Sequence, residues 1–178
     1  MKREVYDRKV NEALAMYEKA NIVLSEEEKA RIEVADFGRD MVDEVGLEIL
    51  TYINTQRVCA KEMVLTPFQT CPEHKHVPTN GMDGKEETFR CRYGKVYLYV
   101  EGEGKREDVK AKIPPTDVTV FHEVILNPGE QYTIMPETWH WFQAGEEGAV
   151  ISEFSTRSTD ETDIFTDSRL VREPKIED

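Results

Sequence analysis

Three of the four histidines in the chain stand where they could bind a common ligand. His74 and His76 are two residues apart, and His140 follows a turn and a strand that begin at Gly129. Side chains two residues apart on an extended chain project to the same side, so two neutral imidazoles can share a metal ion. A His-x-His pair also arises by chance on surface loops. The histidines alone therefore leave both interpretations open.

Glu87 adds a carboxylate to the same candidate site. It alternates with Phe89, Cys91 and Tyr93, and alternation along a strand turns every second side chain to one face. We therefore expect Glu87 to point inward and Glu86 to point outward. A carboxylate buried without a partner costs several kcal/mol, so an inward glutamate calls for a cation. The predicted ligands of a divalent metal are His74, His76, Glu87 and His140.

Two further charged residues, Lys61 and Glu153, share strand faces with apolar side chains. Their neighbours on those faces are Cys59, Met63, Leu65, Ala149 and Ile151. Lys61 could extend its ammonium group to solvent, and Glu153 could form an internal ion pair, with Lys61 as one candidate partner. Alternatively, both side chains act beside the metal. A desolvated, inward carboxylate suits a proton-transferring base, so we expect Glu153 to be catalytic, with Lys61 stabilising or relaying charge.

The remaining chemically notable side chains favour structural roles. Trp139 and Trp141 flank the third histidine, and packing is favoured over a wall on which a sugar stacks. His122 lies in a strand away from both histidine segments, which favours a structural histidine over a substrate contact. Asp160 and Asp163 follow the last strand, where a solvated loop is expected.

The elements that position these residues are mostly short strands. From residue 47 onward, β-branched and aromatic runs alternate with Pro, Gly and Asn signals, which is typical of a barrel or sandwich. The predicted strands cover residues 47–55, 57–67, 87–93, 95–100, 117–126, 131–135 and 149–155. The 178 residues suit one domain, 1–178, with a helical segment at 1–46, a barrel at 47–155 and a polar tail at 156–178.

The helical segment before the barrel has three predicted parts. An amphipathic pattern from Arg3 to Ala20 indicates a helix with one apolar face. Ser25 and Glu28 have the spacing of a capping box, which predicts a second short helix. Residues 36–46 are expected to form a turn and a further helical piece.

The net charge and the cysteines indicate which classes of partner and which cellular compartment to expect. Lys and Arg number 23 against 36 Asp and Glu, a net charge of −13, which disfavours nucleic acid and membrane surfaces. Three cysteines at 59, 71 and 91 fit no disulfide or zinc pattern and are expected to be reduced. No apolar run is long enough for a signal peptide or membrane span, so a cytoplasmic protein is expected.

These residues resemble the two motifs of the cupin superfamily. The first motif is matched by His74, His76, Glu87 and Gly94, and the second by Gly129, Pro136 and His140. Six residues separate Glu87 from Gly94, as in the motif, whereas ten residues, 77–86, stand where the motif has three or four. The resemblance implies a mainly β fold, the cupin barrel (double-stranded β-helix, or jelly roll), with an N-terminal helical segment.

Over nearly its whole length the chain is similar to the cupin D-lyxose isomerases. The similarity is carried by CPEHKH (71–76), KEETFRCRYG (85–94) and the segment 126–165. It implies a homodimeric, manganese-dependent enzyme that interconverts D-lyxose and D-xylulose, often with D-mannose and D-fructose. By ligand type alone Co²⁺, Fe²⁺ and Zn²⁺ suit the site equally. A metal-dependent dioxygenase and a non-catalytic sugar-binding cupin remain the alternatives.

Overall fold

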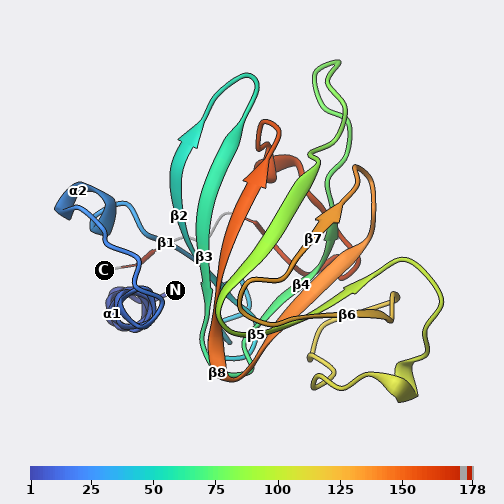
Figure 1. The fold of residues 1–178 in the computed structure, drawn as a ribbon, viewed down its shortest axis with the longest axis horizontal. Helices are drawn as coiled ribbons and strands as arrows, with labels where there is room; N and C mark the ends of the chain where they lie inside the picture. The colour runs from blue at the N-terminus through green and yellow to red at the C-terminus, as the bar shows by residue number, and fades with distance from the viewer. Residues whose placement is uncertain (173–175, 178) are drawn as a thin grey trace.

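The computed structural model describes residues 1–172 and 176–177, which form a strongly curled sheet with helices outside it (Figure 1). The helices are α1 (Arg3–Lys19) and α2 (Glu26–Lys29), and the short 3-10 turns are η1 (Arg106–Asp108) and η2 (Asp160–Thr162). The strands are β1 (Glu33–Ala35), β2 (Leu47–Asn54), β3 (Cys59–Leu65), β4 (Thr70–Lys75), β5 (Glu87–Val100), β6 (His122–Leu126), β7 (Gln131–Ile134), β8 (His140–Ser155) and β9 (Ile164–Phe165).

The long strand β8 organises the sheet. Its first half pairs with β4 and with the end of β5, and its second half pairs with β3 and with the start of β5, all antiparallel. This pairing curls the sheet into a half-barrel with β1 and β2 continuing one side and β6 and β7 the other. The mainly β, barrel-like architecture that the sequence predicts is confirmed.

β5 is one strand where the sequence predicted two. A bulge lies on either side of Gly94, whose φ is 71°, a left-handed conformation that favours glycine. A Cβ at Gly94 would lie 2.0 Å from the carbonyl oxygen of Gly148 in β8. β5 and β8 therefore bend at Gly94 and Gly148 instead of ending there, and they continue to pair on both sides of the bend.

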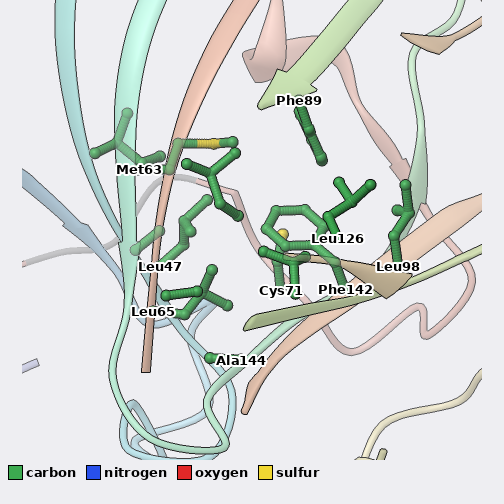
Figure 2. Close-up of a cluster of buried hydrophobic side chains, with 14 of the residues drawn as sticks. Leu47, Met63, Leu65, Cys71, Phe89, Leu98, Leu126, Phe142 and Ala144 are labelled. Atoms are coloured by element: carbon green, nitrogen blue, oxygen red, sulfur yellow. The ribbon is translucent and has the colours of Figure 1, made fainter. Parts of the chain in front are cut away.

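A cluster of buried apolar side chains fills part of the barrel interior (Figure 2). Met63 and Leu65, which share a strand face with Lys61, belong to this cluster, whereas Val64 belongs to a second cluster on the outer face. The alternation predicted for β3 is therefore confirmed, and Lys61 points inward.

α1 covers the outer face of the sheet. Its buried side chains, Ala13, Met16 and Tyr17, belong to one apolar cluster with sheet residues. The sheet residues of this cluster include Leu50, Val64 and Val150. The hydroxyl of Tyr17 also donates to the backbone carbonyl of Glu62 at 3.0 Å. No helix within the described ranges is long and apolar enough to cross a membrane.

The capping box is confirmed, whereas the helix predicted within residues 36–46 is wrong. Ser25 accepts from the backbone N–H of Glu28, and the Glu28 side chain accepts from that of Ser25. Residues 36–46 form turns instead, with Phe37 and Asp40 at φ 50° and 51°. Those left-handed conformations interrupt a helix. The strand predicted over 117–126 is also shorter, since only His122–Leu126 pair.

Candidate active site

The three histidines meet inside the barrel. His74 and His140 are cross-strand partners of β4 and β8, and His76 follows the end of β4. One ring nitrogen from each lies within 4.8 Å of the other two. All three side chains are buried, with 0–7% of their surface exposed. The register of β4 and β8 therefore brings together residues that are up to 66 positions apart in the sequence.

Hydrogen bonds fix which ring nitrogens face the centre. The Nδ1 atoms of His74 and His140 lie 2.8 and 2.9 Å from backbone carbonyl oxygens two residues earlier. A carbonyl only accepts, so each Nδ1 carries a proton, and in the neutral ring the lone pair is then on Nε2. The Nδ1 of His76 instead lies 2.6 Å from a carboxylate oxygen of Asp163.

Glu87 lies with the histidines, as its place in the alternation predicts. Its Oε1 is 3.1 Å from the Nε2 of His76 and 3.1 Å from the Nε2 of His140. Glu87 is 1% exposed, whereas Glu86 is exposed on the other side of the strand. The inward glutamate and the outward one are thus assigned correctly from sequence.

The residues present fit a divalent metal ion. Among residues 1–172 and 176–177, the buried Nε2 of His140 finds no hydrogen-bond partner, despite its 3.1 Å separation from Glu87. One ring nitrogen from each histidine lies within 4.8 Å of the other two, which is near enough for the three side chains to reach one ion after small movements. Three imidazoles and a carboxylate are donors that first-row divalent metals accept.

The charged groups at this centre change one another's pKa values. Burial, together with the nearby His140 and His76, holds the pKa of His74 well below its usual value. Burial and Lys85 also lower the pKa of His76, but the carboxylates of Glu87 and Asp163 outweigh them and raise it to about 9. Burial raises the pKa of Glu87, yet Lys85 and His76 keep it well below its usual range. The glutamate is therefore ionised and available as a ligand.

Lys61 and Glu153 face each other inside the barrel. They are cross-strand partners of β3 and β8, and the Lys61 Nζ lies 3.7 Å from a Glu153 oxygen. Their exposed fractions are 4% and 2%. Lys61 donates to Ser158 at 2.9 Å and to Asp160 at 2.5 Å. The lysine does not extend to solvent, and the internal ion pair considered from sequence is present.

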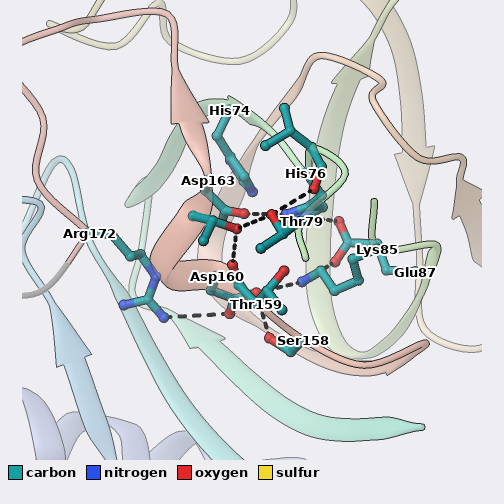
Figure 3. Close-up of polar contacts among 12 residues, drawn as sticks. His74, His76, Thr79, Lys85, Glu87, Ser158, Thr159, Asp160, Asp163 and Arg172 are labelled. Carbon is teal, nitrogen blue, oxygen red and sulfur yellow. Dashed lines mark hydrogen bonds and ion pairs between the residues drawn. The ribbon is translucent and has the colours of Figure 1, made fainter. Parts of the chain in front are cut away.

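Lys85 is a buried lysine of this site that the sequence interpretation missed. Its Nζ lies 2.8 Å from Glu87, 3.3 Å from Glu153 and 3.0 Å from Asp160 (Figure 3). Burial lowers its pKa, but the three carboxylates outweigh burial and raise the pKa well above its usual value. Lys85 therefore stays charged and links the candidate metal ligand to the candidate base.

The solvated loop expected for Asp160 and Asp163 is wrong. Their side chains are 15% and 5% exposed, and each has a carboxylate oxygen within 4.8 Å of a ring nitrogen of His76. Asp160 also lies 3.6 Å from Arg172. The strand β9 pairs with β4, which brings the polar segment after Ser155 across the mouth of the barrel. The pairing of β9 with β4 therefore buries these side chains, although the polar composition of the segment predicted that they would be exposed to solvent.

The space beside the histidines is small in this arrangement. The inner cavity, which includes His74, His76 and Glu153, has a volume of about 30 Å³, far below the roughly 300–1,000 Å³ of typical ligand sites. An outer cavity of about 510 Å³ adjoins it. Lys61, Asp160 and Arg172 line both cavities. The ion pairs of Asp160 therefore separate the outer cavity from the histidines.

The remaining candidates lie outside the centre. Trp141 is 0% exposed and stacks on Tyr99 with ring centroids 4.1 Å apart, which confirms the packing interpretation for it. Trp139 is half-buried, with the Lys75 ammonium 4.7 Å from its ring centroid. His122 lies in β6, where its ring is 2.9 Å from the carbonyl of Glu103.

Comparison with known proteins identifies the family. A family model described as D-lyxose isomerase matches residues 9–178. The chain belongs to the D-lyxose isomerase family. This isomerase is 62% identical over 173 residues to the D-lyxose/D-mannose isomerase of Thermosediminibacter oceani, covering 96% of this chain and 93% of that relative. It is 56% identical to the D-lyxose ketol-isomerase of Cohnella laeviribosi, covering 98% and 95% of the two chains.

The fold of the isomerase is shared more widely. The L-ribose isomerase of Cellulomonas parahominis superposes with a TM-score of 0.76 at 17% identity, covering 99% of this chain and 98% of that one. The mainly β, barrel-like fold expected from the sequence is thus confirmed. The predicted enzyme class, a sugar isomerase, is confirmed by family membership.

Proposed function

We propose that this isomerase interconverts D-lyxose and D-xylulose, and D-mannose and D-fructose, with a divalent metal ion, Mn²⁺ in particular. The observation that carries the proposal is the convergence of three histidine nitrogens and the Glu87 carboxylate beside a second buried carboxylate, Glu153. Relatives at 62% and 56% identity are named as D-lyxose isomerases, one of them also as a D-mannose isomerase.

The candidate ligands of the ion are His74, His76, Glu87 and His140. When bound, the ion would supply a Lewis acid for the carbonyl and adjacent hydroxyl oxygens of the sugar. Lys85 neutralises the second oxygen of Glu87, from which it is 2.8 Å away. The first oxygen is the one that faces the histidines.

Glu153 is the candidate base. The reaction removes a proton from C2 of the aldose. The C–H electron pair becomes the C1–C2 double bond of an enediolate, and the π pair of the C1 carbonyl moves onto its oxygen. A proton is then returned to C1, the proton of the C2 hydroxyl passes to the C1 oxygen, and C2 becomes the carbonyl carbon. Burial lowers the pKa of Lys61, but Glu153 and Asp160 outweigh burial and raise it, so Lys61 stays protonated and cannot accept the proton from C2. Lys61 instead donates a hydrogen bond to the oxygen that becomes negative.

Binding of an open-chain sugar requires Asp160 to release its partners. Its carboxylate contacts Lys61 and Lys85 and fills the route between the outer and inner cavities. Sugar hydroxyl groups are hydrogen-bond acceptors as well as donors, so they can replace the carboxylate on the two ammonium groups. The outer cavity is then the entrance for the substrate.

Chelator-stripped protein, reloaded with Mn²⁺, Co²⁺, Fe²⁺ or Zn²⁺, tests the proposal when it is incubated with a panel of pentoses and hexoses. Chromatography should show D-xylulose formed from D-lyxose by the Mn²⁺-loaded protein and none by the stripped protein. Equal conversion without metal would contradict metal dependence. A requirement for oxygen would indicate a dioxygenase, and sugar binding without conversion would indicate a binding protein.

The cytoplasmic location and the homodimer stay predictions. All three cysteines are free and buried, which agrees with a reducing compartment. The apolar face of α1 is used against the chain's own sheet. If a dimer forms, other surfaces must contribute to it.

A further inference from the structure

The three histidines at the candidate metal centre do not have equivalent partners. His74 and His140 each donate from Nδ1 to an uncharged backbone carbonyl oxygen. His76 lies 2.6 Å from a carboxylate oxygen of Asp163, and the Asp163 side chain is only 5% exposed. A charged acceptor makes a stronger hydrogen bond than a neutral one, and it raises the basicity of the opposite ring nitrogen.

The backbone places Asp163 at this position. In the antiparallel pairing of β4 with β9, His74 is opposite Phe165 and Lys75 is opposite Ile164. The next step of the same register brings Asp163 opposite His76. The backbone N–H of Asp163 also bonds to the carbonyl of Asp160 at 3.2 Å, which closes the η2 turn.

The two aspartates of this turn have different partners. Asp160 contacts the cations Lys61, Lys85 and Arg172. Asp163 instead contacts the Nδ1 of His76, whereas Glu87 contacts the Nε2 of the same ring. The pairing of Asp163 with His76 is thus separate from the ion pairs that occupy the route to the outer cavity.

We propose that Asp163 is a positioning residue of the metal centre: it orients the His76 ring and strengthens Nε2 as a ligand. The segment after the last barrel strand is then part of the metal site, although it supplies no direct ligand. This inference rests on the proposed function, because it requires that the four candidate ligands bind a divalent ion.

The test is the Mn²⁺ affinity of Asp163→Asn, measured by competition with a chelating dye. The asparagine keeps the size of the side chain and removes its charge. Loss of such a partner typically weakens metal binding about 10- to 100-fold, and this is the expected result. Glu161→Gln is the matched control, since it removes one exposed negative charge from the same turn and should leave the affinity unchanged.

A second readout separates positioning from folding. Thermal unfolding in chelator should be similar for the parent and Asp163→Asn, whereas the increase in Tm caused by Mn²⁺ should be smaller in the variant. Asp163→Glu keeps a carboxylate and should bind Mn²⁺ more tightly than Asp163→Asn. The reverse order would overturn the inference, as would an affinity of Asp163→Asn within twofold of the parent.

The same measurements distinguish the inference from the proposed function. If the parent protein does not bind Mn²⁺ or Co²⁺, the proposed metal dependence fails. If the parent binds Mn²⁺ and Asp163→Asn binds it equally well, the metal centre stands and the role of Asp163 fails.

Discussion

The ammonium group of Lys85 lies 3.3 Å from the carboxylate of Glu153, deep inside the barrel. The same ammonium group contacts Glu87 at 2.8 Å. One buried cation therefore neutralises both the candidate base and the candidate metal ligand. Without the Lys85 ammonium, the negative charges of Glu87 and Glu153 would be neutralised less completely. Burial of an unneutralised charge raises the free energy of the folded state.

Replacement of Lys85 should slow turnover. In Lys85→Gln, a positive charge 3.3 Å from Glu153 and 2.8 Å from Glu87 is lost, so two buried carboxylates lose the cation that lies between them. The kcat measured at saturating Mn²⁺ should therefore fall below that of the parent. An unchanged kcat would show that Lys85 does not act on the base.

Metal content should distinguish Glu87 from Glu86. Glu87→Gln replaces the carboxylate that lies 3.1 Å from two histidines, so most of the bound divalent ion should be lost. Glu86→Gln changes an exposed side chain and should retain the ion. Elemental analysis of the two purified variants checks this, and loss from Glu86→Gln alone would contradict the assigned ligand.

A buried carboxylate outside the site predicts how stability varies with pH. Burial raises the pKa of Glu48 to about 7, although Lys9 and Gln69 partly oppose this. The folded state then binds the proton more tightly than the unfolded state, whose pKa is near 4.5. Stability should therefore fall as pH rises from 4.5 to 7, by up to roughly 3 kcal/mol from this group.

Glu48→Gln should remove this part of the decline. Guanidinium unfolding of the parent and the variant at pH 5 and pH 8 would measure this decline. Glu12→Gln is the control, since Glu12 also pairs with Lys9 but is only partly buried. If the parent and Glu48→Gln lose the same stability between the two pH values, the assignment to Glu48 is wrong.

Strand alternation was sufficient to predict which way the barrel residues point. Lys61, Glu87 and Glu153 were assigned inward from their apolar neighbours, and all three are at most 4% exposed. Lys85 is two residues before Glu87, so the same alternation could have found it. It was missed because residues 77–86 were interpreted only as a spacer between motif positions.

The residues after the barrel could not be placed from local pattern. Asp160, Asp163 and Arg172 belong to a polar, acidic segment whose composition is also that of a solvated tail. Their burial depends on the two-residue strand β9, which pairs with β4 at a distance of about 90 positions in the sequence. Such non-local pairing leaves no periodic signal in a short segment.

The most direct test of the account is the turnover of Glu153→Gln with D-lyxose, measured on protein whose Mn²⁺ content equals that of the parent. Glu153 is the proposed base, and within the described part of the chain its hydrogen-bond and ion-pair partners are Lys61, Lys85 and Ser155, not the histidines. The substitution should therefore leave the metal in place and slow isomerisation about 100- to 10,000-fold. Near-normal turnover at equal Mn²⁺ content would contradict the account and leave Glu153 as an ion-pair partner only.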